Sequence, residues 1–100
     1  MDLHINTAEY GKVKLGLVEK KQTHAQQEFF VKPHESGYIL EKLEEFLKSS
    51  KIKNPESEIR NIIVYKGGGS FTGLRIGTAV AQGLGLAWNV PIKVKNTLNK

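Results

Sequence analysis

Hydrophobic and polar residues alternate in the first third of the chain, a pattern that predicts β-strands. Leu3 and Ile5 begin a short strand, and the segment KVKLGLV places three apolar residues on one face: Val13, Leu15 and Leu17. After a polar turn in KKQTHAQ, the segment EFFVK predicts a third strand that ends at Pro33, because aromatic and β-branched residues favour strands. Short links between the three strands predict an antiparallel meander.

The pattern becomes helical after Glu35. The segment SGYILEKLEEFLKSS carries apolar residues at helical spacing, with Ser36 as the expected N-cap: Ile39, Leu40, Leu43, Phe46 and Leu47. A polar connector, KIKNPESE, then precedes the apolar run IRNIIVYK, which is typical of a central parallel strand. A second helix is predicted from about Thr72 to Trp88, and VPIKVK predicts a last strand.

The predicted order, βββαβαβ, is the first-half arrangement of ribonuclease-H-like and actin-like folds. We therefore expect a single α/β domain over residues 1–100, with a mixed five-stranded sheet and two main helices. The absence of cysteine excludes a disulfide framework and a thiolate zinc site. The N-terminus lacks the apolar run of a secretory signal, and no window has the length of a membrane span, so we expect a cytoplasmic protein without a membrane contact.

The net charge of +5 is distributed unevenly along the chain. All ten acidic residues lie between Asp2 and Glu58, whereas the segment from Ile59 onward holds six basic residues and no acid: Arg60, Lys66, Arg75, Lys93, Lys95 and Lys100. A basic half is typical of a surface that meets nucleic acid or an acidic protein, although a solvated face with no specific partner explains it equally well. A module that contacts tRNA through this half is one hypothesis for the function.

The glycine loop before the second helix is the most distinctive local feature. It fits neither the phosphate-loop pattern, because Leu74 and Arg75 replace the Lys and hydroxyl residue, nor the dinucleotide pattern, because Thr72 replaces the third glycine. A generic anion site at the helix start remains open, formed by Gly67, Gly68, Gly69, Ser70, Thr72 and Arg75. We favour the structural alternative, a tight turn with a capping hydroxyl. No carboxylate follows Glu58 to hold magnesium near the loop.

Small residues recur at intervals of four along the second helix, at Gly73, Gly77, Ala81 and Gly85. Each internal glycine costs about 1 kcal/mol relative to alanine, so close packing must compensate. The partner of this ridge is either the protein's own sheet or another chain. Because the helix is apolar on several sides, we expect a partner interface formed by Ile39, Leu43, Phe46, Gly73, Gly77, Val80, Ala81 and Leu84.

Other candidate chemistry is sparse. His4, His24 and His34 do not form a close ligand pair, and no serine has an identifiable base, so the sequence predicts no metal site, no cofactor and no catalytic residue. The glutamates of the first helix are read as its solvated face.

The segment GGGSFTGLRIGTAVAQGLG resembles the hallmark of the TsaB (formerly YeaZ) family, subunits of the machinery that makes threonylcarbamoyladenosine on tRNA. The hallmark reads G-P-G-S-F-T-G-[LV]-R-[IV]-G and continues into a helix that contains A-Q-G-L. The chain matches it from Gly67 to Gly77, except that Gly68 replaces the proline, and again at residues 81–84. NVPIKVKNTL is similar to the family's next strand, and the order of elements agrees from Leu3 onward.

This resemblance implies the first of two actin-like lobes and a non-catalytic scaffold. It implies a homodimer formed through the helices, a catalytic TsaD-like partner, a TsaE-like ATPase, and contact with tRNA through that complex. The family's first strand typically carries an Asp where this chain has Asn6, before Thr7, which argues against ATP chemistry. The rival interpretation is an enzyme that binds phosphate or ATP through the loop from Gly67 to Thr72.

Overall fold

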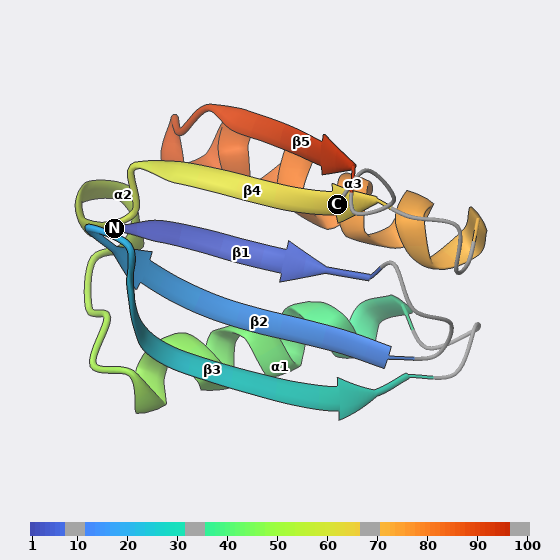
Figure 1. Ribbon diagram of the computed structural model, residues 1–100, viewed down its shortest axis with the longest axis horizontal. Helices are drawn as coiled ribbons and strands as arrows, with labels where there is room; N and C mark the ends of the chain where they lie inside the picture. Colours follow the sequence, from blue (N-terminus) through green and yellow to red (C-terminus); the bar gives the residue numbers. More distant parts are fainter. Residues whose placement is uncertain (8–11, 32–35, 67–70, 97–100) are drawn as a thin grey trace.

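The fold is built on one five-stranded sheet. The computed structural model describes residues 1–7, 12–31, 36–66 and 71–96, without the side chains of residues 36, 37, 66, 71–78 and 96. The strands lie in the order β3-β2-β1-β4-β5 (Figure 1). Their bounds are Asp2–Asn6 for β1, Lys12–Glu19 for β2, Gln22–Phe30 for β3, Asn61–Lys66 for β4 and Ile92–Asn96 for β5. The first three pair antiparallel, whereas β1, β4 and β5 pair parallel.

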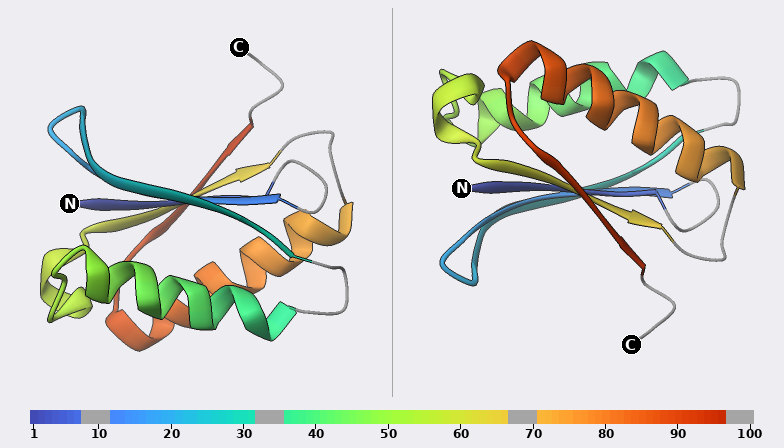
Figure 2. Two further views of the ribbon diagram at one scale, coloured as in Figure 1. Left: turned by 90° about the horizontal axis from the view of Figure 1, so that it is seen from below. Right: turned by 90° about the horizontal axis from the view of Figure 1, so that it is seen from above.

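Two long helices cover one face of this sheet. Helix α1 spans Ser36–Ser49 and α3 spans Phe71–Trp88, and both lie on the same side in the two edge-on views of Figure 2. A single-turn helix, α2, spans Pro55–Glu58. The order βββαβαβ, the mixed sheet and the actin-like fold class are thereby confirmed. The predicted polar connector is wrong in one detail, because α2 forms inside it, with Pro55 at the position where helices accept proline.

The third strand is also longer than the sequence predicts. We expected a polar turn through residue 26, but only Lys20 and Lys21 form the turn, and β3 begins at Gln22. An edge strand with one face open to water accepts polar side chains at most positions, so its sequence lacks the alternation that reveals a central strand. A register shift at Val18, which pairs with Thr23, leaves His24 as the extra residue of a β-bulge.

The core lies between the sheet and the two long helices. Leu3 and Ile5 of β1 are fully buried, and Leu15, Ile62 and Val64 lie beside them on the neighbouring strands. Four α1 side chains cover them at the predicted helical spacing: Ile39, Leu43, Phe46 and Leu47. Each such side chain contributes roughly 1.5–3 kcal/mol relative to leaving it in water.

Helix α3 packs closely on the sheet through small residues. Ala81 is fully buried, and a Cβ placed on Gly85 would lie 2.8 Å from Ile92 Cδ1 and 3.0 Å from the carbonyl oxygen of Val90. The helix ends one turn later, where the Val90 N–H donates to the Gly85 carbonyl oxygen at 2.9 Å and Asn89 adopts a φ of 56°. This is the Schellman arrangement, in which a left-handed residue ends the helix.

Three lysines occupy left-handed backbone positions that usually favour Gly or Asn. Lys20 and Lys21, with φ values of 51° and 66°, are the two central residues of the β2–β3 turn. Lys51, with φ 65°, ends α1, where the Ile52 N–H donates to the Leu47 carbonyl oxygen at 2.9 Å. The left-handed conformation costs a residue with a Cβ roughly 1–2 kcal/mol, so local backbone preference does not explain lysine at these positions.

The face of the sheet opposite the helices carries polar pairs. His4 Nδ1 lies 2.6 Å from Tyr65 Oη, and the two rings stack with their centroids 5.5 Å apart. Beside them, the Asn61 amide donates to the Asp2 carboxylate at 3.0 Å. Partial burial lowers the pKa of His4 below its ordinary value of 6.5, and partial burial also raises the pKa of Tyr65. At neutral pH, the pair therefore consists of an uncharged imidazole and a protonated phenol.

In α3, Gly83 is exposed and Gly85 is buried, so we expect opposite changes in stability when each is replaced by alanine. Gly83→Ala should raise the free energy of unfolding by about 1 kcal/mol, because nothing lies within 4 Å of the added Cβ and alanine favours helix. Gly85→Ala should lower it, because Ile92 and the Val90 carbonyl must move away. Urea unfolding of both variants tests this; an equal gain at both positions would show that α3 does not depend on the close approach at Gly85.

The His4–Tyr65 pair predicts a loss of stability in mild acid. Because the pKa of folded His4 lies below 6.5, the unfolded chain binds the proton first as the pH falls through that value, and proton uptake then favours unfolding. The melting temperature should therefore drop between about pH 7.5 and about pH 5.5. His4→Gln should weaken this dependence, whereas His24→Gln should keep it. An unchanged pH profile in the His4 variant would contradict the assignment.

Candidate functional site

The predicted anion site falls largely outside the described residues. Gly67, Gly68, Gly69 and Ser70 are not described, and Thr72 and Arg75 lie in the first turns of α3 without described side chains. The loop from Gly67 to Thr72 therefore stays a prediction. Within the described ranges, no group of three or more His, Cys, Asp or Glu side chains is placed to hold a metal ion.

A buried hydroxyl lies next to that region. Thr7 follows β1, is 1% exposed, and its Oγ1 has no hydrogen-bond partner among the described residues. The preceding residue, Asn6, pairs with Tyr65 near the end of β4, so Thr7 lies at the edge of the sheet that leads into the glycine loop. A buried hydroxyl without a partner is unusual, because burial costs a polar group its bonds to water. The sequence singled out Thr7 only as the neighbour of Asn6.

A groove of about 700 Å³ lies between α1, α2 and α3 on the helix layer. Its floor and walls are apolar, with Leu47 and Ile52 at the end of α1, Pro55 of α2, and Leu84 and Trp88 of α3. Leu40 lies at one side and is 43% exposed. The groove is therefore an apolar surface that the chain's own residues leave partly uncovered.

Charged side chains line the rim of this groove. Three of the lining residues are basic, Lys48, Lys51 and Lys53, and one is acidic, Glu44. An apolar floor with a charged rim is the usual anatomy of a protein–protein interface, and this rim favours a partner with acidic residues.

The structure corrects half of the predicted interface. Ile39, Leu43, Phe46 and Ala81 are buried in the chain's own core, so their side chains are not available at the surface. Val80 and Leu84 are half-buried and pack against the core. Gly73 and Gly77 lie in the part of α3 for which burial is not described, so their place in the interface stays a prediction. The ridge of small residues thus serves internal packing at Ala81 and Gly85.

The prediction went wrong because both long helices are apolar over more than one face. From periodicity alone, the sequence shows which residues share a face but not which face the sheet covers. Leu40, one residue after the buried Ile39, was read as part of the core and is the exposed member of the pair.

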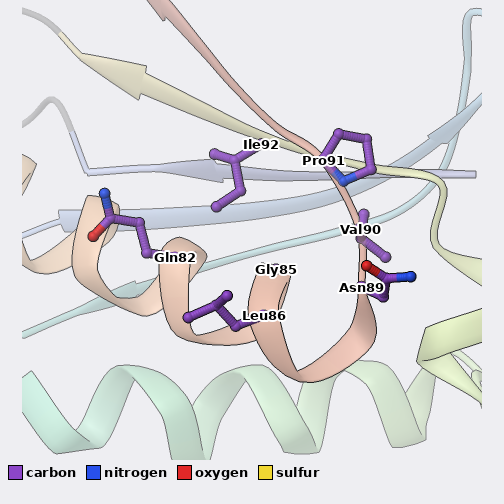
Figure 3. A pocket seen from close by; sticks show the side chains of 7 residues that line it. All are labelled: Gln82, Gly85, Leu86, Asn89, Val90, Pro91 and Ile92. Atoms are coloured by element: carbon purple, nitrogen blue, oxygen red, sulfur yellow. The ribbon is translucent and has the colours of Figure 1, made fainter.

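A second hollow lies at the outer edge of α3, where the chain turns into β5. Figure 3 shows Gln82 and Leu86 on the helix and Pro91 and Ile92 on the strand side. Its volume is about 670 Å³, and none of its seven described lining residues is charged. Leu86 is 86% exposed there. Its described lining therefore offers amide groups but no charged ligand for a metal or an anion. No helix described here is long and apolar enough to cross a membrane.

Comparisons with known proteins agree with this fold and with the glycine-loop motif. Residues 19–99 match the model of the TsaD family, described as tRNA N6-adenosine threonylcarbamoyltransferase. A tRNA threonylcarbamoyladenosine biosynthesis protein, TsaB, from Buchnera aphidicola subsp. Baizongia pistaciae is 44% identical over 54 residues, which cover 54% of this chain and 24% of that protein.

Two solved structures from Pseudomonas aeruginosa share the fold. One is YeaZ, with a TM-score of 0.77, and the other is a protein described as similar to peptidase YeaZ, with a TM-score of 0.78. Each is 21% identical, and 96% of this chain aligns with 43% and 44% of theirs. The chain thus spans less than half the length of these relatives.

The family match covers most of the chain, and both the motif and the fold point to the same subgroup. The chain belongs to the TsaD family of tRNA N6-adenosine threonylcarbamoyltransferases, within which it is similar to TsaB (YeaZ).

Proposed function

We propose that this protein is a non-catalytic subunit in the synthesis of threonylcarbamoyladenosine on tRNA, and that it binds a catalytic TsaD-like subunit or a second copy of itself through the α1–α3 groove. The observation that carries the proposal is the groove itself, an apolar surface with a basic rim on the helix layer of a family member. A TsaE-like ATPase belongs to the same proposed assembly. We propose that the chain contacts tRNA through this assembly.

A scaffold role is favoured by what the described residues offer chemically. They provide no cluster of metal ligands, and the hollow beside α3 contains no charged group. Asn6 supplies an amide where the resemblance leads us to expect a carboxylate, and the sequence has no acid after Glu58. A phosphate-transfer site needs groups that hold Mg²⁺ close to the phosphates, and carboxylates are the usual ones.

The groove is suited to a helix from the partner. Its apolar residues come from three elements that converge in one concave surface, and its volume of about 700 Å³ accommodates several side chains. Leu40 and Trp88 are the apolar anchors, because each is partly exposed and large enough to fill a pocket in the partner. The rim lysines would then contact acidic residues around that helix.

Substitution in the groove should disrupt this pairing without unfolding the chain. Leu40→Glu introduces a carboxylate onto the apolar surface but leaves the buried core untouched, so we expect co-elution with a TsaD-like subunit to weaken at least about tenfold. Leu86→Glu is the matched control, since it makes the same change at a more exposed leucine outside the groove. Size-exclusion chromatography with light scattering measures both the heteromer and the homodimer.

The outcomes separate the possible interfaces. Loss of pairing in Leu40→Glu alone supports the groove. Loss in Leu86→Glu alone places the partner on the outer edge of α3, and unaffected pairing in both variants removes the helix layer from consideration. Failure of the wild-type chain to pair with itself or with a TsaD-like subunit would refute the proposed function.

The enzyme alternative has one supporting observation at the carboxyl end of β1, the buried Oγ1 of Thr7, which has no hydrogen-bond partner among the described residues. We expect the isolated chain to show no micromolar affinity for Mg-ATP, because Asn6 and the acid-free second half offer no carboxylate for the metal. Isothermal titration calorimetry with Mg-ATP measures this directly. Micromolar binding that is lost in Thr7→Val would instead favour a nucleotide site at this edge of the sheet.

A further inference from the structure

The three lysines with left-handed backbone, Lys20, Lys21 and Lys51, belong to the same end of the molecule. The β2–β3 turn, the N-terminus and helix α2 lie together at the end of the sheet where β1 and β4 begin (Figures 1 and 2). Lys51 lines a shallow surface there together with Met1 and His24. We call this region the strand-start end and define its basic residues as Lys20, Lys21, Lys51, Lys53 and Arg60.

Contacts of the backbone place the remaining two cations in the same region. The Arg60 N–H donates to the Met1 carbonyl oxygen at 2.7 Å, which brings Arg60 beside the start of β1. Lys53 follows Lys51 by two residues, and its N–H donates to the Glu58 carboxylate of α2 at 3.0 Å. The five basic side chains thus come from three separate segments, and all five are exposed.

Four acidic residues also lie near this end, and three of them have other contacts. Asp2, at the start of β1, accepts a hydrogen bond from the Asn61 amide. Glu19 lies 3.8 Å from His24, and Glu58 accepts the backbone N–H groups of Lys53 and Asn54. Glu56 is an exposed acid on α2. No ion pair among the described residues involves any of the five basic side chains of the strand-start end. Their charges are therefore directed to the solvent.

The left-handed backbone at Lys20, Lys21 and Lys51 means that local backbone preference does not explain why lysine occupies these positions. A turn with two left-handed central residues is best served by Asn-Gly, and a left-handed helix end by Gly. Strained positions persist where the surrounding structure holds them in place, and they cluster at functional sites. The property that Lys20, Lys21 and Lys51 share, and that Asn and Gly would lack, is a long cationic side chain.

We propose that the strand-start end binds the phosphate backbone of RNA. The inference rests on the proposed function, in which the chain works in an assembly that acts on tRNA. The basic residues reach from the β2–β3 turn, which curls away from the helices in Figure 2, across the N-terminus to Lys51 and Lys53 on the helix side. Such a row of separated cations fits a polymer with a charge at every nucleotide.

An acidic protein fits this surface less well. Protein interfaces depend on buried apolar or aromatic anchors, and the exposed large hydrophobic residues that are described lie on other segments: Phe30, Tyr38, Leu40, Leu86 and Val94. Phosphate contacts need only cations and freedom of the side chains to adjust. Four of the five basic residues precede Ile59, so this surface lies largely outside the acid-free segment that the sequence suggested.

The decisive variant replaces Lys20 with Asn and Lys21 with Gly together. It removes two cations and relieves the strained turn, so the melting temperature should rise by roughly 5 °C while RNA binding weakens. Fluorescence anisotropy with an unmodified tRNA transcript in about 50 mM salt should show affinity at least about tenfold lower, and the slope of log K against log salt should fall by about 2. Lys51→Gly should act in the same two directions with about half the change in slope.

The matched control is Lys93→Gln with Lys95→Gln, which removes the same charge from exposed positions on β5. Its affinity should stay within about threefold of the wild type. Equal weakening in both double variants would show that only net charge matters and would overturn the proposal. Unchanged affinity in the turn variant would overturn it as well, as would a wild-type chain that fails to bind the transcript both alone and with a TsaD-like subunit.

Failure of this inference is distinguishable from failure of the proposed function. The turn variant should still co-elute with the TsaD-like subunit, because Lys20 and Lys21 do not line the groove. Retained pairing without RNA contact at this end would leave the scaffold role standing and refute only the RNA surface. If the turn variant loses RNA affinity but the wild-type chain pairs neither with itself nor with a TsaD-like subunit, the RNA surface would stand and the scaffold role would be refuted.

Discussion

The pairing of β1 with two neighbours of opposite direction is the interaction on which the rest of the structure depends. Its five residues bond antiparallel to β2 and parallel to β4, so this short strand joins the meander to the strand–helix units. Leu3 and Ile5, both fully buried, lie on the face that the helices cover, and His4 points to the other face. The period of two along a strand allows no other arrangement, since a shift by one residue would exchange the two faces.

This arrangement gives the molecule three separate surfaces. The helix layer carries the α1–α3 groove, the opposite face of the sheet carries the polar pairs of His4 with Tyr65 and Asp2 with Asn61, and the strand-start end carries the five cations. Parallel strands connected by helices bring α2 and the ends of α1 and α3 to the edge where β4 and β5 begin (Figure 1). The charged segments are therefore gathered by topology, although they are far apart in the sequence.

Much of this could be predicted from the sequence, because alternation and helical spacing are direct consequences of burial. The inward-facing positions of β1 and β2 and the apolar face of α1 followed from period alone, and the order of the elements followed from the same patterns. The assignment of Ile39, Leu43 and Phe46 to the core did not follow, because the sequence placed them in a partner interface. The long edge strand β3 did not, since its polar side chains conceal it. The left-handed backbone of Lys20, Lys21 and Lys51 could not be predicted either. Sequence-based turn prediction expects Asn or Gly at such positions, so lysine gives no signal for them.

The assignment of the small-residue ridge to a partner interface was incomplete for a different physical reason. Ala81 and Gly85 were correctly recognised as residues that let a neighbour approach closely, but spacing does not identify the neighbour, and here it is the sheet itself. Once the sheet has covered that face, Leu40 and Trp88 remain partly exposed on α1 and α3, and they are the residues through which we propose that a partner binds. On a small domain, the candidates for an interface are thus the apolar residues that the domain's own core does not bury.

The groove and the strand-start end share two residues, and this has a consequence for assembly. Lys51 and Lys53 line the groove and also belong to the basic row, whereas Lys20 and Lys21 do not line it and Arg60 does not either. A partner in the groove would cover part of the row and bring its own charges next to the rest, because the two surfaces meet at the end of α1. RNA affinity and partner binding are then coupled in both directions, as any two ligands that share contacts must be. An acidic partner surface at this position would weaken RNA binding, and a basic one would extend the row and strengthen it.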